Sequence, residues 1–238
     1  MSTQLPLTRH LEGLRSAMVA FVRYADRAGL AAPVPTCPGW TVRDLVAHLG
    51  SAHRSTAAML RGESEAVAEP MSGDPMEWLR DGAIELVEAI TRAPQEFWAR
   101  RACHQTTLRA VDALAAVFGR PPEAAETWIA TDLAVDGIDE MLTGFATRPT
   151  SRLRSDEDAV LVVAPDDVPD WWLLRVGPHP AVAQRGDGPR PEVPAADWEL
   201  VGPAVSLYLA LWDRSARPMS RGPWTSPPGV GLTSASQY

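Results

Sequence analysis

Apolar residues recur every three to four positions through most of the first 150 residues, which is the spacing of amphipathic helices. Residues 7–29 give the first such run, which ends at Gly29. Four more helices are predicted, over residues 41–62, 75–93, 95–118 and 123–145. Because long helices joined by short connections pack side by side, this pattern predicts an antiparallel helix bundle over residues 1–150.

The pattern changes after residue 150. Two compact runs rich in β-branched and aromatic residues, 159–163 and 171–176, predict strands joined by a hairpin-like turn. Residues 177–194 are rich in proline and glycine and are expected to form a loop. An amphipathic helix is predicted over 203–214. The fold class is therefore α+β, with a small α+β domain over residues 151–216 and a disordered tail over 217–238.

The composition narrows the classes of function. The net charge of -8 argues against binding to nucleic acid, which needs a basic surface. No apolar run approaches the ~20 residues that cross a bilayer, and the N-terminus lacks the apolar core of a signal peptide. Two cysteines, Cys37 and Cys103, cannot form a disulfide framework, so we expect a cytoplasmic protein.

All 22 basic residues are arginine, a bias that a GC-rich genome explains. Schiff-base chemistry, a lysine general base and a phosphate-binding loop lysine are thereby excluded. Neither Cys37 nor Cys103 has an obvious activating partner nearby in the sequence, which argues against a nucleophilic thiol. The remaining candidates for catalytic side chains are histidine, arginine, the carboxylates and the amides.

The helix predicted at 41–62 carries two histidines. Thr41 is expected to cap its start, with Asp44 near the positive end of the helix dipole. On a helical wheel His53 lies near the centre of the buried face, whereas His48 lies on its flank. A flank position lets an imidazole face a cavity between helices. A structural role and a catalytic role remain open for each histidine.

The helix predicted at 95–118 carries polar residues where a buried face would be apolar. The stripe consists of Trp98, Ala102, Gln105, Arg109, Asp112 and Ala116, with His104 beside it. One interpretation is an exposed face on which Arg109 pairs with Asp112 at i, i+3. The other is a wall of a functional cavity that presents an amide, a guanidinium and a carboxylate in successive turns.

Several motifs together resemble a known family. Residues 37–49 read Cys-Pro-Gly-Trp-Thr-Val-Arg-Asp-Leu-Val-Ala-His-Leu, with His-Arg at 53–54. This resembles the second-helix signature of the mycothiol-dependent maleylpyruvate isomerase family, and residues 97–113, 132–142 and 197–212 resemble later segments in the right order. The resemblance covers about residues 8–215. It implies a DinB-like four-helix bundle, a C-terminal domain similar to sterol carrier proteins, and mycothiol as a cosubstrate.

The resemblance also implies a divalent metal, usually zinc, and here the sequence departs from the family. His48 matches one family ligand, but Gln105 and Arg109 stand at the positions that we match to the family's Glu and His. Glutamine is a neutral and poor ligand, and an arginine cation cannot ligate a metal. One imidazole does not make a three-ligand site. The residues therefore argue against an intact zinc site.

A different site chemistry follows from the same positions. The Arg109 guanidinium could clamp a carboxylate or phosphate, or stabilise a developing oxyanion. His48 could act as general acid or base, because an unperturbed imidazole titrates near neutral pH. The catalytic candidates are His48, Arg109, Gln105 and His53, and the substrate-binding candidates are Arg109, His104, Trp98 and Trp40. Alternatively, Arg109 only pairs with Asp112 in a site that has lost its chemistry.

Three functions remain open from the sequence. The first is a mycothiol-dependent isomerase or S-transferase. The second is a metal-independent enzyme, such as an isomerase, cyclase or lyase of specialised metabolism. The third is a non-catalytic ligand-binding or accessory protein on the same scaffold. The two enzymes act on a small molecule, and the third protein keeps the pocket for a ligand or the C-terminal domain for a partner. The sequence is compatible with a homodimer.

Overall fold

The computed structural model describes residues 5–63, 71–189 and 196–215. The tail predicted over 217–238 lies outside the described residues. The chain forms two compact units, one from Leu5 to Pro122 and a second that begins at Glu123. The domain boundary expected near residue 150 remains a prediction; the compact units divide between Pro122 and Glu123.

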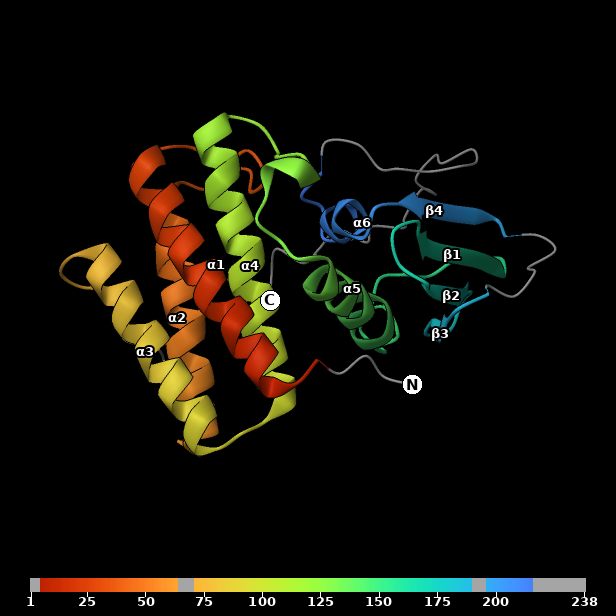
Figure 1. Ribbon diagram of the computed structural model, residues 1–238, viewed down its shortest axis with the longest axis horizontal. Coiled ribbons are helices and arrows are strands. Elements are labelled where there is room, and N and C mark those ends of the chain that lie inside the picture. Colours follow the sequence, from red (N-terminus) through yellow and green to blue (C-terminus); the bar gives the residue numbers. More distant parts are fainter. Residues whose placement is uncertain (1–4, 64–70, 190–195, 216–238) are drawn as a thin grey trace. The chain divides into compact units, whose positions relative to one another are not determined.

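The first unit is a bundle of four long helices (Figure 1). They are α1 (Leu7–Ala28), α2 (Val42–Leu60), α3 (Pro75–Arg92) and α4 (Glu96–Phe118). Each begins and ends within two residues of the range that the apolar spacing predicts. Its fully buried large side chains include Leu14, Phe21, Leu45, Leu49, Leu79, Leu86 and Ile90. The predicted helical bundle is therefore confirmed.

The turn before α2 is fixed by local hydrogen bonds. Gly39 has a φ of +82°, a left-handed conformation that glycine adopts without strain. The Thr41 backbone N–H and hydroxyl both donate to the Asp44 carboxylate, at 2.8 and 2.7 Å. Val34 N–H donates to the Trp40 carbonyl at 2.9 Å, which closes the loop on itself. The predicted cap is thus present, and it sets where the side chains of α2 point.

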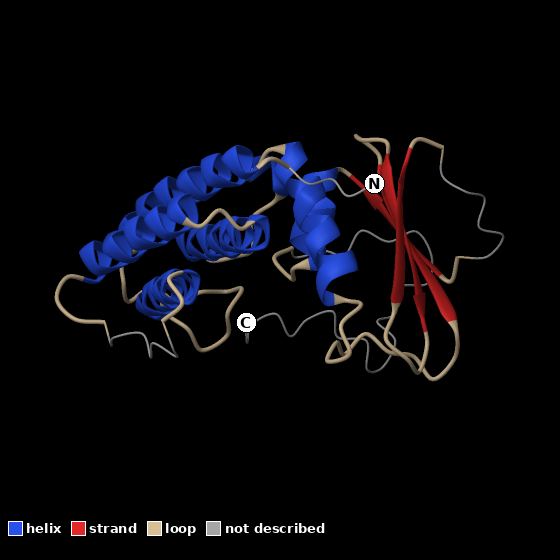
Figure 2. Ribbon diagram, turned by 90° about the horizontal axis from the view of Figure 1, so that it is seen from below, coloured by secondary structure: helices blue, strands red, loops and turns tan. Residues whose placement is uncertain are grey.

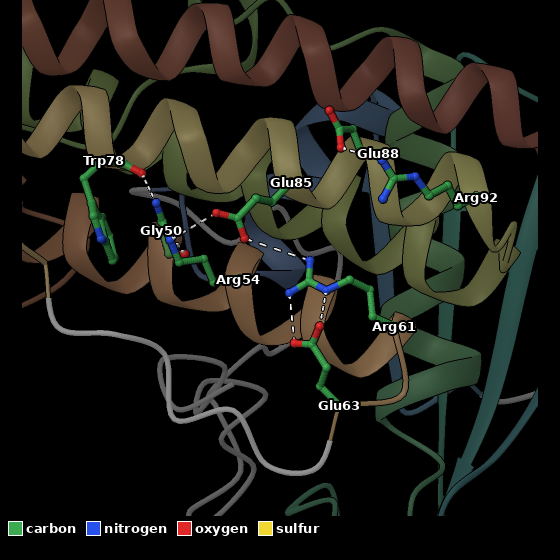
Figure 3. A network of polar contacts seen from close by, with 8 residues as sticks. All are labelled: Gly50, Arg54, Arg61, Glu63, Trp78, Glu85, Glu88 and Arg92. Atoms are coloured by element: carbon green, nitrogen blue, oxygen red, sulfur yellow. Dashed lines mark hydrogen bonds and ion pairs between the residues drawn. The ribbon is translucent and has the colours of Figure 1, made fainter.

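Helices α2 and α3 run in the same direction, and so do α1 and α4, whereas α2 and α4 run antiparallel (Figure 1). Figure 3 shows polar contacts between side chains of α2 and α3. Arg54 donates to the Trp78 carbonyl at 2.6 Å, and Arg61 lies 4.0 Å from Glu85 about two turns farther along. Near the start of the contact, the Trp78 ring occupies the space where a Cβ on Gly50 would lie, only 2.1 Å away. This glycine permits the close approach of the two helices.

The second unit is a mixed four-stranded sheet with helices on one face (Figure 2). Its strands are β1 (Ala159–Pro165), β2 (Asp170–Val176), β3 (Val182–Asp187) and β4 (Trp198–Gly202), in the order β3-β2-β1-β4. The strand β1 pairs antiparallel with β2 and parallel with β4. The helices are α5 (Thr131–Asp139) and α6 (Ala204–Leu211), which confirms the predicted last helix.

Buried polar contacts join α5 to the sheet in this unit. Trp172 is fully buried, and its indole N–H donates to the Asp139 carboxylate at 3.0 Å. Arg185 of β3 lies 3.5 Å from the same carboxylate and 2.5 Å from Asp170. A guanidinium shared between two carboxylates compensates their charge inside the unit.

Two expectations from the sequence were wrong. The single helix expected over 123–145 is divided into a short 3-10 turn, η1 (Ala124–Glu126), the helix α5, and a π-helical turn, η2 (Glu140–Phe145). Glu126 caps the backbone N–H of Glu123 at 2.7 Å and the Thr127 hydroxyl bonds back to Ala124, so the first turn closes on itself.

The second error concerns the loop expected over 177–194, which contains the strand β3. This strand is at the edge of the sheet and pairs only with β2 among the described strands. Its residues are exposed or half-buried, and Val182 and Ala183 are followed by Gln184 and Arg185, so no apolar alternation marks the strand. In the described parts of the chain, no helix is long and apolar enough to cross a membrane.

Candidate functional site

His48 and Arg109 meet between α2 and α4. The Arg109 atom Nη2 lies 3.4 Å from Nε2 of the half-buried His48. Trp40, from the turn before α2, contacts both: its ring meets the His48 ring edge-on at 5.2 Å, and the Arg109 guanidinium lies 5.4 Å from its centre. The structure therefore brings three of the predicted site residues together.

The guanidinium of Arg109 is held on its other side by a buried carboxylate. Nη1 donates to Asp112 at 2.9 Å and to the sulfur of Cys37 at 3.4 Å. The Thr36 hydroxyl donates to the second Asp112 oxygen at 2.6 Å. Arg109 is 3% exposed and Asp112 is fully buried. The i, i+3 pair expected from the sequence thus exists, but it is inside the protein and not on an exposed face.

Burial and the neighbouring cation keep His48 neutral. Removal from solvent is the larger cause, and the Arg109 charge adds to it; the two lower the pKa of His48 to about 4, although Asp112 opposes them. A guanidinium has only N–H donors, so Nε2 of His48 must accept and the ring proton must sit on Nδ1. At neutral pH the site therefore presents one cation, one carboxylate and a neutral imidazole.

His53 has a different environment. It is 1% exposed, and its Nε2 lies 2.9 Å from the hydroxyl of Thr106. Burial, with a smaller effect of Arg54, lowers the pKa of His53 to about 3. Its Nδ1 has no hydrogen-bond partner among the described residues. These contacts support a structural role, and a catalytic role for His53 remains an untested prediction.

The other predicted site residues lie elsewhere on α4. Trp98 stacks edge-on against Phe97 at 4.9 Å, and eleven residues of helix, about 16 Å, separate it from Arg109. His104 is 1% exposed, and its ring meets the ring of His10 edge-on, with 6.4 Å between the ring centres. Gln105 is half-buried, one turn before Arg109 on the same side of the helix. Of these three, Gln105 is the one whose position favours a place beside the His48–Arg109 contact.

Sequence reasoning missed two contributors to this site. Thr36 and Cys37 stand 76 and 72 positions before their partners Asp112 and Arg109. No local signal links residues so far apart. The Cys-Pro-Gly-Trp turn was the available hint, because a fixed turn beside a helix start places its side chains reproducibly.

Possible metal ligands do not gather around His48 in the helical unit. Among its described residues, no three His, Cys, Asp or Glu side chains bring ligand atoms within 4.8 Å of one another. The hydrogen-bond partner of His48 Nε2 is Nη2 of Arg109. This nitrogen belongs to a cation and has no lone pair with which to bind a metal.

The chain matches two family models along most of its length. Residues 11–134 match the mycothiol maleylpyruvate isomerase N-terminal domain, and residues 132–222 match the C-terminal domain of the same family, abbreviated MDMPI. No curated protein matches the chain.

Two solved structures are similar to most of this chain. The crystal structure of a histidine-to-alanine mutant of the mycothiol-dependent maleylpyruvate isomerase superimposes with a TM-score of 0.53, at 13% identity, over 88% of this chain and 90% of that one. The crystal structure of the mycothiol-dependent maleylpyruvate isomerase itself aligns over the same shares with a TM-score of 0.44 and 13% identity. At 13% identity, the likeness to the mutant structure concerns the fold alone.

Proposed function

This chain belongs to the mycothiol-dependent maleylpyruvate isomerase family, and we propose that it is a small-molecule enzyme that works without the family's metal. The family supports an isomerase-like activity with mycothiol as the thiol cosubstrate. A conjugating S-transferase activity, a role in specialised metabolism and a cytoplasmic location belong to the same proposal. The chemistry is assigned to Arg109 and His48.

The observation that carries this proposal is the 3.4 Å contact between Nη2 of Arg109 and Nε2 of His48. A zinc ion on this imidazole would sit ~2 Å from the ring nitrogen. It would then lie beside a positively charged guanidinium that is anchored by Asp112. Two cations at this separation repel each other strongly in a buried site. The residues around His48 therefore do not fit the metal, and no step is assigned to one.

Arg109 can take over the electrostatic part of the metal's role. A guanidinium binds a carboxylate through two parallel N–H bonds and stabilises an oxyanion that forms in the transition state. Its position is fixed in advance by Asp112 and Cys37, so little reorganisation is needed when charge develops. The proposal is that Arg109 binds an anionic group of an electrophilic substrate and stabilises negative charge there.

His48 is the proton carrier in this scheme. Its Nε2 accepts the proton of the thiol as the sulfur adds to the carbon–carbon double bond of the substrate. The electron pair of that bond moves to the conjugated carbonyl oxygen. Rotation about the resulting single bond and return of the electron pair expel the thiolate, which recovers its proton from His48. No atom is gained or lost, as an isomerisation requires. Trp40 forms one wall beside both groups.

The alternative is a non-catalytic protein that binds a ligand on the same scaffold. The observation that favours it is the mutual satisfaction of Arg109, Asp112, Thr36 and His48, which could hold a site closed without chemistry. Under this alternative the contacts stabilise the bundle and an anion still binds at Arg109.

The test is turnover of maleylpyruvate with mycothiol in a buffer that contains a zinc chelator. We expect turnover that survives the chelator and is lost in both His48→Ala and Arg109→Met. Turnover that stops with chelator and returns with added zinc would overturn the metal-independent proposal. Ligand binding without turnover of any electrophilic carboxylate favours the non-catalytic alternative.

A further inference from the structure

Some N–H groups of Arg109 donate hydrogen bonds to described residues, and others do not. A guanidinium has five N–H donors. The two on Nη1 go to Asp112 and Cys37, and one on Nη2 goes to His48. The N–H on Nε makes no hydrogen bond to the described residues, and it shares an edge of the planar group with Nη2. This edge is the one that binds a carboxylate side-on.

The two ends of the guanidinium are held with different strength. At Nη1 the partner is a fully buried carboxylate at 2.9 Å, which is itself fixed by the Thr36 hydroxyl at 2.6 Å. At Nη2 the partner is a neutral ring nitrogen at 3.4 Å, which is long for an N–H hydrogen bond. The bond to His48 is therefore the one that a competing anion displaces first, while Asp112 keeps the side chain in place.

We propose that Arg109 is a removable cover on His48: a ligand carboxylate binds to the Nε–Nη2 edge and takes Nη2 away from the imidazole. In the free protein the lone pair of His48 is occupied by a donor, so the ring cannot accept a proton from a thiol. When the anion binds, that lone pair becomes available at the moment when substrate is present. Asp112 and Thr36 are then positioning residues that act through Arg109. This inference rests on the proposed function, since it concerns how the same site is activated.

The cover can be tested by chemical modification of the histidines. Diethylpyrocarbonate acylates neutral, accessible imidazoles. His10, His53 and His104 are at most 2% exposed, whereas His179 is exposed and serves as the reference inside the same molecule. We expect His48 to react slowly relative to His179 in the wild type at pH 7. In the double variant Arg109→Met/Asp112→Asn, that ratio should rise several-fold.

The double variant removes both charges of the buried pair, so it does not leave one of them alone in the interior. Asp112→Asn by itself is the matched control: it keeps the cover and removes the anchor, and we expect a smaller rise. If the ratio of His48 to His179 modification is the same in the wild type and in the double variant, Arg109 does not cover His48 and the inference is wrong.

The second half of the test uses acetate as the anion, with chloride at equal ionic strength as control. The measurement is NMR of ¹⁵N-labelled protein. Acetate should change the chemical shift of the Arg109 Nε–H group. It should also change the ¹⁵N chemical shift of His48 Nε2 toward the value of a ring nitrogen that accepts no hydrogen bond. A response at Arg109 with none at His48 overturns the cover but leaves the proposed anion site intact. No response at either residue overturns the proposed function together with the inference.

Discussion

Nη2 of Arg109 lies 3.4 Å from Nε2 of His48, and the contact joins α4 to α2 across 61 positions of the sequence. It places a permanent cation at the ring nitrogen that a metal ion would need. It also gives the imidazole a donor that holds it neutral and in one tautomer.

The buried pair of Arg109 and Asp112 should behave as a unit in folding. Arg109→Met leaves a carboxylate uncompensated in the interior, so we expect a loss of about 3–5 kcal/mol in the free energy of unfolding. The double variant Arg109→Met/Asp112→Asn should be more stable than Arg109→Met alone. Urea unfolding of the wild type, both single variants and the double variant measures this. Purely additive effects of the two substitutions would show that the pair is not coupled.

Stability should fall as the pH is lowered from about 6.5 to about 3. In the folded protein the pKa of His48 is lowered to about 4 and that of His53 to about 3, whereas an unfolded histidine has a pKa near 6.5. Below 6.5 the unfolded chain therefore binds protons that the folded chain takes up only at lower pH, which favours unfolding. His53→Gln removes one of these groups and should flatten the dependence between pH 6.5 and 4.

The control for that measurement is His179→Gln, at an exposed position outside the bundle. We expect it to leave the pH dependence of the unfolding free energy unchanged. Thermal unfolding in a series of buffers from pH 4 to 7 gives the comparison. Equal slopes for His53→Gln and the wild type would mean that His53 is not buried in a neutral state.

Gly50 should tolerate no side chain, because the Trp78 ring would lie 2.1 Å from a Cβ there. The ring is part of the α2–α3 contact and cannot move without disturbing Arg54, which lies 4.1 Å from its centre. We expect Gly50→Ala to destabilise the protein by about 1–3 kcal/mol, the usual cost of overpacking.

Gly144 offers the matched control for Gly50. It also lies in a helical segment, and nothing lies within 4 Å of an added Cβ. Gly144→Ala is expected to be neutral or to stabilise by up to about 1 kcal/mol, because alanine lowers the entropy of the unfolded chain. Chemical unfolding of both variants measures the difference. Similar effects at the two positions would contradict the packing described for α2 and α3.

The four long helices could be predicted because each carries a continuous apolar stripe that matches the helical period. The strand β3 could not, since an edge strand with Gln184, Arg185 and Asp187 buries too little to leave an apolar pattern. The division of residues 123–145 depends on the bonds from Glu126 and Thr127 back to the preceding turn, and such short-range competition is not visible in periodicity.

The sequence could predict which residues belong to the candidate site better than it could predict how they contact one another. His48, Arg109 and Trp40 stand out by residue type and by position on their elements. The anchoring of Arg109 by Asp112, Thr36 and Cys37 depends on packing between segments more than 70 residues apart, except for the local Arg109–Asp112 pair. Helix periodicity gives the face on which a side chain lies, but not which distant side chain meets it.

We propose that Arg109 takes the place of a metal ion beside His48. The most direct test of this proposal is the zinc content of the protein purified without chelator and then incubated with one equivalent of zinc and passed over a desalting column. We expect far less than one zinc per chain, with the same value in His48→Ala. One zinc per chain in the wild type, lost in His48→Ala, would contradict it.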